Sequence, residues 1–270
     1  MRPKMPENLL LAIDVGNSRV KFGVFERVTT STTRSALPQI VAMISVAAAE
    51  TIDWATVLTG LAAWSPSMAT AVIAGANPAG VERLLSTWPA ALPATPGVVR
   101  QASELPLRVN TEHPDKVGID RLLDAVAANV LRRSDDAAVI VDAGTATTVD
   151  LVSADGSFEG GAILPGLELG ARALHQYTAL LPMIDVPALL ERPVAPIGKN
   201  TREAIGSGLW FGQIGAIREL IALFSERAGR PPLVLATGGN GRSLAPALES
   251  NARFEPDLAL RGLAHIAQSP

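Results

Sequence analysis

The sequence predicts an α/β protein whose two halves share a topology, and three observations support this prediction. Short apolar runs typical of strands alternate with longer segments whose apolar residues recur at helical spacing. Hydrophobic residues make up 48% of the 270 residues, which is enough to fill a substantial core. One turn motif follows an apolar strand at Asp14 and follows another at Asp142.

The first half alternates strand and helix patterns. An apolar run at residues 9–13 leads into a turn at 14–18 and then into alternating apolar residues, which we interpret as strand, turn and strand. Residues 37–49 are predicted to form a helix. A strand at 71–73, a helix at 78–88 and a proline-rich surface loop complete this half.

The second half repeats the order strand, turn, strand. An amphipathic helix is predicted at 117–133, and an apolar strand at 137–141 then leads into a turn at 142–148 and a second strand. We place the domain boundary at the start of the helix, with an N-terminal domain at 1–117 and a C-terminal domain at 118–270. The remaining predicted elements are helices at 167–180 and 202–227, a strand at 233–236, a turn at 237–240 and a helix that starts at 244.

The two turns share more than their place after a strand. Asp14 and Asp142 are each followed by a glycine two residues later and by a hydroxyl residue soon after. This weak repeat suggests that the halves have related topology. Because aspartate and glycine are common in turns, a chance coincidence is the alternative.

Composition and charge exclude several classes of protein. The sequence has no cysteine, which excludes disulfides, thiol catalysis and cysteine-based metal sites and fits a reducing compartment. No apolar run approaches the roughly 18 residues that span a bilayer. A net charge of −3 and a pI near 5.7 provide no basic footprint for nucleic acid. We therefore expect a cytoplasmic protein that binds a small molecule, with no membrane and no nucleic-acid partner.

The chemistry of the two aspartate–glycine turns favours a site for phosphate and metal. Glycine lets backbone amides approach an anion closely, and a neighbouring hydroxyl can donate to a phosphate oxygen. An aspartate at the same place is a poor phosphate ligand unless a cation such as Mg²⁺ lies between the two. Two such turns facing each other across a cleft would clamp a metal–nucleotide complex. Neither has the spacing of a Walker loop or of a dinucleotide fingerprint.

Asp120, near the start of the predicted helix at 117–133, has two interpretations. An aspartate in the first helical turn is favoured by the helix dipole and can act as a cap. An aspartate held at a helix start beside a cleft can instead accept the proton of a substrate hydroxyl in phosphoryl transfer. The neighbouring Arg121 suits a substrate carboxylate through paired hydrogen bonds.

Six motifs follow one another along the chain: Asp14-Val-Gly-Asn-Ser18, Gly118-Ile-Asp-Arg121, Asp142-Ala-Gly-Thr-Ala-Thr-Thr-Val-Asp150, Gly160-Gly-Ala-Ile-Leu-Pro-Gly166, Gly198-Lys-Asn-Thr201 and Thr237-Gly-Gly-Asn240. In this order they resemble type III pantothenate kinases, a family that includes relatives of the Bvg accessory factor. Arg19-Val-Lys21 is similar to the accessory-factor variant, and Thr178-Ala-Leu-Leu-Pro182 also looks like the family.

This resemblance implies a fold, a reaction and an assembly. The fold would be that of the actin-like ATPases, with two ribonuclease H-like domains and mixed sheets. The reaction would be the ATP-dependent phosphorylation of pantothenate, the first step of coenzyme A biosynthesis. The resemblance also implies Mg²⁺ with ATP, a monovalent cation (K⁺ or NH₄⁺) and a homodimer with the pantothenate pocket near its interface.

The resemblance also assigns a role to each motif residue. Asp120 would accept the proton of the substrate hydroxyl, Asp142 would bind the monovalent cation, and Asp14 would lie near Mg²⁺. Thr201 would contact pantothenate, and its alternative is an N-cap for a helix that begins at Arg202. The ATP site would comprise Asp14, Val15, Gly16, Asn17, Ser18, Arg19, Val20, Lys21 and Thr145, and the pantothenate site Gly118, Ile119, Asp120, Arg121 and Thr201.

One departure from the family keeps two other functions open. Thr111 stands where the family often has a tyrosine three residues before the proline that precedes the Gly-x-Asp-Arg motif, so a ring is missing from the substrate pocket. The first alternative is a nucleotide-binding regulator without turnover. The second is a kinase that phosphorylates another small alcohol.

Overall fold

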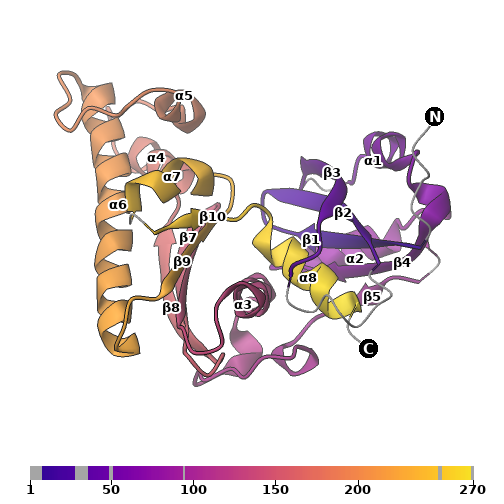
Figure 1. Ribbon diagram of the computed structural model, residues 1–270. Helices are drawn as coiled ribbons and strands as arrows, with labels where there is room; N and C mark the ends of the chain where they lie inside the picture. Colours follow the sequence, from indigo (N-terminus) through magenta and orange to yellow (C-terminus); the bar gives the residue numbers. More distant parts are fainter. Residues whose placement is uncertain (1–7, 28–35, 49–50, 94, 249–250, 269–270) are drawn as a thin grey trace, which may run out of the picture. The chain divides into compact units, whose positions relative to one another are not determined.

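The computed structural model describes residues 8–27, 36–48, 51–93, 95–248 and 251–268 (Figure 1). The chain forms two compact units, of which unit 1 comprises Met1–Arg133 with Asp257–Pro270 and unit 2 comprises Ser134–Pro256. This division differs from the predicted boundary between residues 117 and 118, because the first helix after that boundary and the C-terminal helix both belong to unit 1. Among the described residues, no helix is both long and apolar enough to cross a bilayer.

Unit 1 is built on a mixed five-stranded sheet in the order β3-β2-β1-β4-β5. β1, β2 and β3 are antiparallel neighbours, whereas β4 runs parallel to β1 and β5 parallel to β4. β1 is apolar almost throughout because both of its faces are covered. The strands are β1 (Leu9–Val15), β2 (Arg19–Glu26), β3 (Ile40–Ala47), β4 (Met68–Ala74) and β5 (Gly97–Val98).

Helices cover the sheet of unit 1. The core beside α1 (Trp54–Leu61) and α2 (Pro78–Ser86) contains alternate β1 side chains, while α8 (Leu258–Gln268) contacts β1, β2 and β4. α3 (Ile119–Leu131), which the sequence predicted, packs against α8. Gly262 of α8 permits this contact, since a side chain there would collide with the Leu123 carbonyl of α3.

The helix predicted at residues 37–49 is wrong, because the structure has the strand β3 there. Short apolar runs do not distinguish a helix from a strand by periodicity. The β-branched residues Val41, Ile44 and Val46 suit a strand, and β3 pairs with β2 from Arg19 opposite Ala47 onwards. Pairing with β2 therefore determines that these residues form a strand and not a helix.

Unit 2 repeats the topology of unit 1, which confirms the relation inferred from the two turns. Its mixed sheet has the order β10-β9-β6-β7-β8, so the central strand β6 has an antiparallel and a parallel neighbour just as β1 does. The strands are β6 (Ala138–Ala143), β7 (Ala146–Val152), β8 (Phe158–Pro165), β9 (Leu233–Thr237) and β10 (Arg253–Phe254), and the helices are α4 (Leu167–Gln176), α5 (Val186–Leu190), α6 (Thr201–Ala228) and α7 (Gly241–Leu248).

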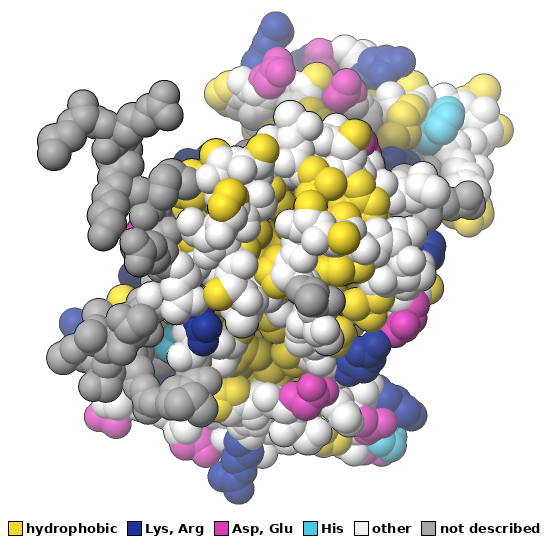
Figure 2. All heavy atoms as spheres, turned by 90° about the vertical axis from the view of Figure 1, so that its right-hand side faces the viewer, with side chains coloured by type: hydrophobic (Ala, Val, Ile, Leu, Met, Phe, Trp, Pro, Cys, Tyr) yellow, Lys and Arg dark blue, Asp and Glu magenta, His cyan; other side chains and the backbone are white. Residues whose placement is uncertain are grey.

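Figure 2 shows one face of the molecule in space-filling form. Hydrophobic side chains gather near the middle of this face, and acidic and basic side chains are interspersed around them. This mixture of signs agrees with a sequence that holds 23 basic and 26 acidic residues.

Candidate functional site

The turn between β1 and β2 presents its backbone to solvent. The Gly16 amide donates to the Arg19 carbonyl at 3.0 Å, while Asn17 and Ser18 are exposed. The guanidinium of Arg19 is engaged by β3, since Nε donates to Ser45 Oγ at 2.7 Å and Nη2 to Ser45 O at 3.0 Å. The turn is therefore closed by its own hydrogen bond and exposes the small polar residues Asn17 and Ser18 at its tip.

Three of the residues predicted to bind ligands bury their side chains. Val15 and Val20 flank the turn with 1% exposure each, and Ile119 of α3 is 6% exposed. These side chains fill the core, so only their backbone atoms are available to a ligand.

Three carboxylates and one lysine lie together in unit 1. Burial raises the pKa of Asp14 to about 6, Lys21 opposes this rise, and the charges of Asp120 and Asp257 add to it. Asp14 and Lys21 are opposite each other in the β1–β2 ladder, and Lys21 Nζ donates to Asp257 Oδ1 at 2.8 Å. The arrangement brings the predicted residues Asp14, Lys21 and Asp120 within electrostatic reach of one another.

Asp120 lies in the first turn of α3, whose N-cap is Gly118. Its Oδ1 accepts a hydrogen bond from the Arg121 amide at 2.9 Å, as an acidic group in a first helical turn can. A side chain at position 118 would crowd the same oxygen at 2.6 Å, so Gly118 leaves room for the carboxylate. Besides bonding the Arg121 amide, the Asp120 carboxylate raises the pKa of Asp14 through its charge.

The four charged groups fit a divalent cation carried in with phosphates. Three carboxylates against one lysine leave a surplus of negative charge, and the pKa of Asp14 is raised by its burial and, to a smaller extent, by the other two carboxylates. Within the described ranges, no three acidic or histidine side chains form a metal cage. Mg²⁺ does not need one, because it commonly binds through one or two carboxylates, water and substrate phosphates.

The second turn, in unit 2, packs closely against the Asp142 carboxylate. Asp142 is opposite Thr148 and Thr237 in the sheet, and Gly238 lies against Asp142 Oδ1 and the Ala143 carbonyl with φ of 83°. This left-handed backbone and close approach explain the glycine. A carboxylate oxygen with a backbone carbonyl nearby is the kind of ligand that an alkali cation takes.

The segment after β9 ties this turn to α4. The Asn240 amide donates to Ala143 O at 3.0 Å, and Asn240 Nδ2 donates to Glu168 Oε2 at 3.0 Å. The sequence motif indicated Asn240, but Glu168 had no signal beyond its place near a helix start.

Thr145 and Thr201 are both exposed residues of unit 2. The Thr145 carbonyl accepts from the Gly166 amide at 3.1 Å, which leaves its side chain outside that contact. The alternative for Thr201 is wrong, because the N-cap of α6 is Asn200, whose side chain accepts from the Glu203 amide at 3.0 Å.

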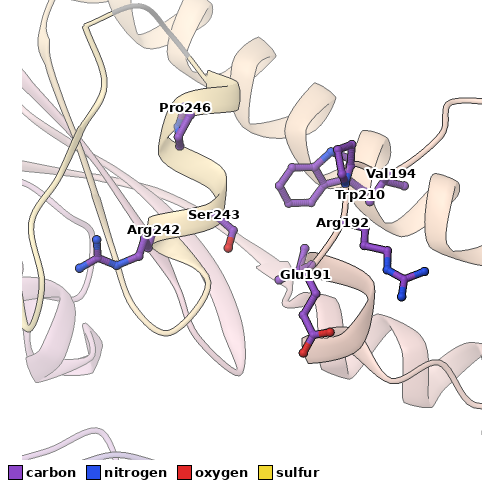
Figure 3. A pocket seen from close by; sticks show the side chains of 9 residues that line it. Glu191, Arg192, Val194, Trp210, Arg242, Ser243 and Pro246 are labelled. Carbon is purple, nitrogen blue, oxygen red and sulfur yellow. The ribbon is translucent and has the colours of Figure 1, made fainter.

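Unit 2 also contains a cavity of about 440 Å³ that includes none of the residues predicted from the sequence. Trp210 of α6 and Ser243 and Pro246 of α7 line it together with the segment that follows α5 (Figure 3). Arg242 points away from Trp210, and its guanidinium lies 4.7 Å from the centre of the Phe254 ring. The volume of this cavity is within the range of small-molecule pockets.

Solved structures share the fold of this chain. The ethanolamine utilization protein EutJ from Carboxydothermus hydrogenoformans superposes with a TM-score of 0.52 at 13% identity, covering 98% of this chain and 90% of that one. A glucokinase from an Antarctic psychrotroph superposes with a TM-score of 0.52 at 10% identity, covering 97% and 99%. The fold is that of the actin-like ATPases, as the sequence resemblance implied.

Sequence comparison identifies the family. A type III pantothenate kinase from Desulfosudis oleivorans is 34% identical over 272 residues, covering 97% of this chain and 99% of the relative. Another from Rhodospirillum rubrum is 34% identical over 264 residues, covering 94% and 96%. The profile of type III pantothenate kinases matches residues 10–223. The chain therefore belongs to the type III pantothenate kinase family.

Proposed function

We propose that this protein transfers the γ-phosphoryl group of ATP to the primary hydroxyl of pantothenate, the first step of coenzyme A biosynthesis. Membership of the family supports the reaction. The observation that carries the mechanism is the grouping of Asp14, Lys21 and Asp120 in unit 1. Phosphoryl transfer depends mainly on positioning and on neutralising charge, and this group contains a base, a cation and a metal-binding carboxylate.

The exposed turn at residues 16–19 and Lys21 would hold the phosphates of ATP. Asp14 would hold Mg²⁺, which neutralises charge on the transferring phosphoryl group when it is bound. The raised pKa of Asp14 supports this role, since a carboxylate that is costly to ionise gains from a cation. Lys21 supplies a compact positive charge suited to phosphate.

Asp120 would orient the pantothenate hydroxyl and accept its proton. The N-terminal end of α3 holds this carboxylate in place, and Arg121 would bind the carboxylate of pantothenate. Gly118 and the Ile119 backbone would complete the wall of the substrate site, and Thr201 of unit 2 would add a hydroxyl contact.

The Asp142 turn would bind K⁺ or NH₄⁺, and Thr145 would contact ATP. The Asp142 carboxylate and the Ala143 carbonyl beside Gly238 support the choice of an alkali cation.

The protein would act as a homodimer. Four large apolar side chains of unit 2 are mainly exposed and are candidates for burial in such an interface. They are Ile163 at 65%, Tyr177 at 80%, Leu180 at 92% and Ile197 at 69%. The expectation of a cytoplasmic protein stays a prediction.

Coupled ADP release with ATP, Mg²⁺, K⁺ and pantothenate tests the reaction. We expect Asp120→Asn to fold, to bind ATP like the parent protein and to lose turnover by roughly 10²–10⁴-fold, the usual contribution of a general base. The matched control is Asp115→Asn, which removes an exposed carboxylate five residues earlier. Full turnover by Asp120→Asn would remove this residue from the mechanism.

The same assay separates the two alternatives. A regulator without turnover would bind ATP and release no ADP with pantothenate. A kinase for another alcohol would release ADP faster with a different member of a panel of small alcohols.

A further inference from the structure

Asp257 stands where the chain returns from unit 2 to unit 1, and no sequence motif includes it. It is the first residue of the returning segment and directly precedes α8. Its carbonyl accepts from the Arg261 amide at 2.9 Å, so its backbone starts the first turn of that helix. Its side chain takes no part in that helical hydrogen bond and instead accepts one from Lys21.

The ion pair between Asp257 and Lys21 is partly buried. Lys21 Nζ lies 2.8 Å from Asp257 Oδ1, with side-chain exposures of 27% for the lysine and 14% for the aspartate. Exposed ion pairs contribute little, but a partly buried, charge-assisted hydrogen bond restricts a flexible lysine more strongly. The bond to Asp257 therefore fixes where the Lys21 ammonium lies.

The backbone at Asp257 is unusual. Among the described residues, only Asn8 and Asp257 combine a side chain with a left-handed backbone, with φ of 72° and 52°. Aspartate and asparagine tolerate this conformation better than most residues, although glycine is easier still. A glycine here would satisfy the backbone alone, so the observed aspartate indicates a use for the side chain.

We propose that Asp257 is a positioning residue that holds the Lys21 ammonium over the β1–β2 turn for the phosphates of ATP. This inference rests on the proposed role of that turn in binding ATP. Asp257, the first residue of the segment that returns to unit 1, would thereby determine where the Lys21 ammonium lies beside the β1–β2 turn.

The experiment is a double-mutant cycle on the dissociation constant for ATP, measured by calorimetry with Mg²⁺ on the full chain. Asp257→Gly keeps the left-handed backbone and removes the carboxylate, and Lys21→Met removes the ammonium. We expect each single variant to weaken ATP binding by about tenfold, which corresponds to about 1.4 kcal/mol. The Asp257→Gly effect should disappear when Lys21 is already Met.

Further readouts separate positioning from a structural role. Asp257→Asn keeps one oxygen acceptor and the backbone preference, so it should weaken ATP binding by less than Asp257→Gly does. In steady state, KM should rise for ATP and stay unchanged for pantothenate. Glu82→Gln, which breaks an exposed ion pair with Arg100 in the same unit, is the control and should leave both constants unchanged.

The outcomes are distinguishable. If Lys21→Met binds ATP as the parent protein does, the proposed role of the turn is wrong. If Lys21→Met weakens binding and neither Asp257 variant does, only the positioning role is overturned. An Asp257→Gly effect that persists in the Lys21→Met background, or tighter ATP binding by Asp257→Gly, would also overturn it. If Asp257→Gly fails to fold, the same cycle with Asp257→Asn tests the proposal, and its smaller effect should also disappear in the Lys21→Met background.

Discussion

Asp14→Asn should stabilise unit 1 at neutral pH while abolishing its use of Mg²⁺-ATP. Burial and two neighbouring carboxylates raise the pKa of Asp14 from its ordinary value of 3.8 to about 6, even though Lys21 lowers it. At about 1.4 kcal/mol per pKa unit, the charged form costs up to about 3 kcal/mol in the folded protein. Because Asp14 keeps some solvent exposure, we expect a gain of about 1.5 to 3 kcal/mol for the neutral variant.

The pH dependence follows from the direction of this pKa change. A carboxyl whose pKa is higher in the folded than in the unfolded state retains its proton on folding, so stability falls as pH rises from about 4 to about 6. Above about pH 6 the penalty is complete and constant. The difference in unfolding free energy between Asp14→Asn and the parent should therefore grow across this range and then level off.

The assay is urea unfolding in EDTA without nucleotide, followed by tryptophan fluorescence. Trp54, Trp64 and Trp88 belong to unit 1, whereas Trp210 belongs to unit 2, so a Trp210→Phe background makes the signal specific for unit 1. Asp53→Ala is the control, because its effect on the free energy of unfolding should have the opposite sign. Hydrogen bonds from Thr56 lower the pKa of Asp53, so that variant should lose stability above pH 4, with a loss that shrinks on acidification.

A flat difference curve between pH 4 and 8, or an Asp14→Asn variant less stable than the parent at pH 7, would refute this reasoning. The first result would mean that the Asp14 carboxyl is as easily ionised in the folded protein as in water. The second would mean that its attraction to Lys21 outweighs the cost of burial and of the neighbouring carboxylates. A stabilised but inactive variant is the trade-off expected of a residue retained for function.

Three other substitutions test separate parts of the structure. Asp142→Ala should weaken the response of ADP release to added K⁺; a variant with the parent's K⁺ titration would contradict the cation assignment. Gly262→Ala should destabilise unit 1 by about 1 to 3 kcal/mol in urea unfolding, because the new methyl group meets the Leu123 carbonyl. Thr111→Val should leave the urea midpoint unchanged or raise it, because the Thr111 hydroxyl is buried and has no hydrogen-bond partner among the described residues; a clear loss of stability would argue against this.

Much of the fold was readable from local patterns. The order strand, turn, strand appears at Asp14 and again at Asp142, and the structure places each turn after the central strand of its own sheet. The pattern of α3 was equally clear, since its apolar side chains recur on one face and most of them are buried. A helix or strand can be predicted in this way when its apolar residues recur at the spacing of that element.

Elements decided by distant partners could not be predicted. β3 has an apolar sequence compatible with a helix, and its pairing with β2 makes it a strand. The same holds for the site, because the Lys21–Asp257 contact joins residues 236 positions apart. The left-handed backbone of Asp257 had no sequence signal either, as an aspartate after a proline is equally compatible with an ordinary turn.

The two units separate the proposed base and phosphate site, both in unit 1, from the proposed cation site in unit 2. Because α3 belongs to unit 1, the proposed base Asp120 and the phosphate turn share one packed body, held by α8 against both α3 and β1. Asp257 directly precedes α8, so the anchor for Lys21 is attached to the helix that supports α3. A substitution that loosens α8, such as Gly262→Ala, should therefore disturb base and phosphate site together, whereas Asp142 in unit 2 should keep its cation response.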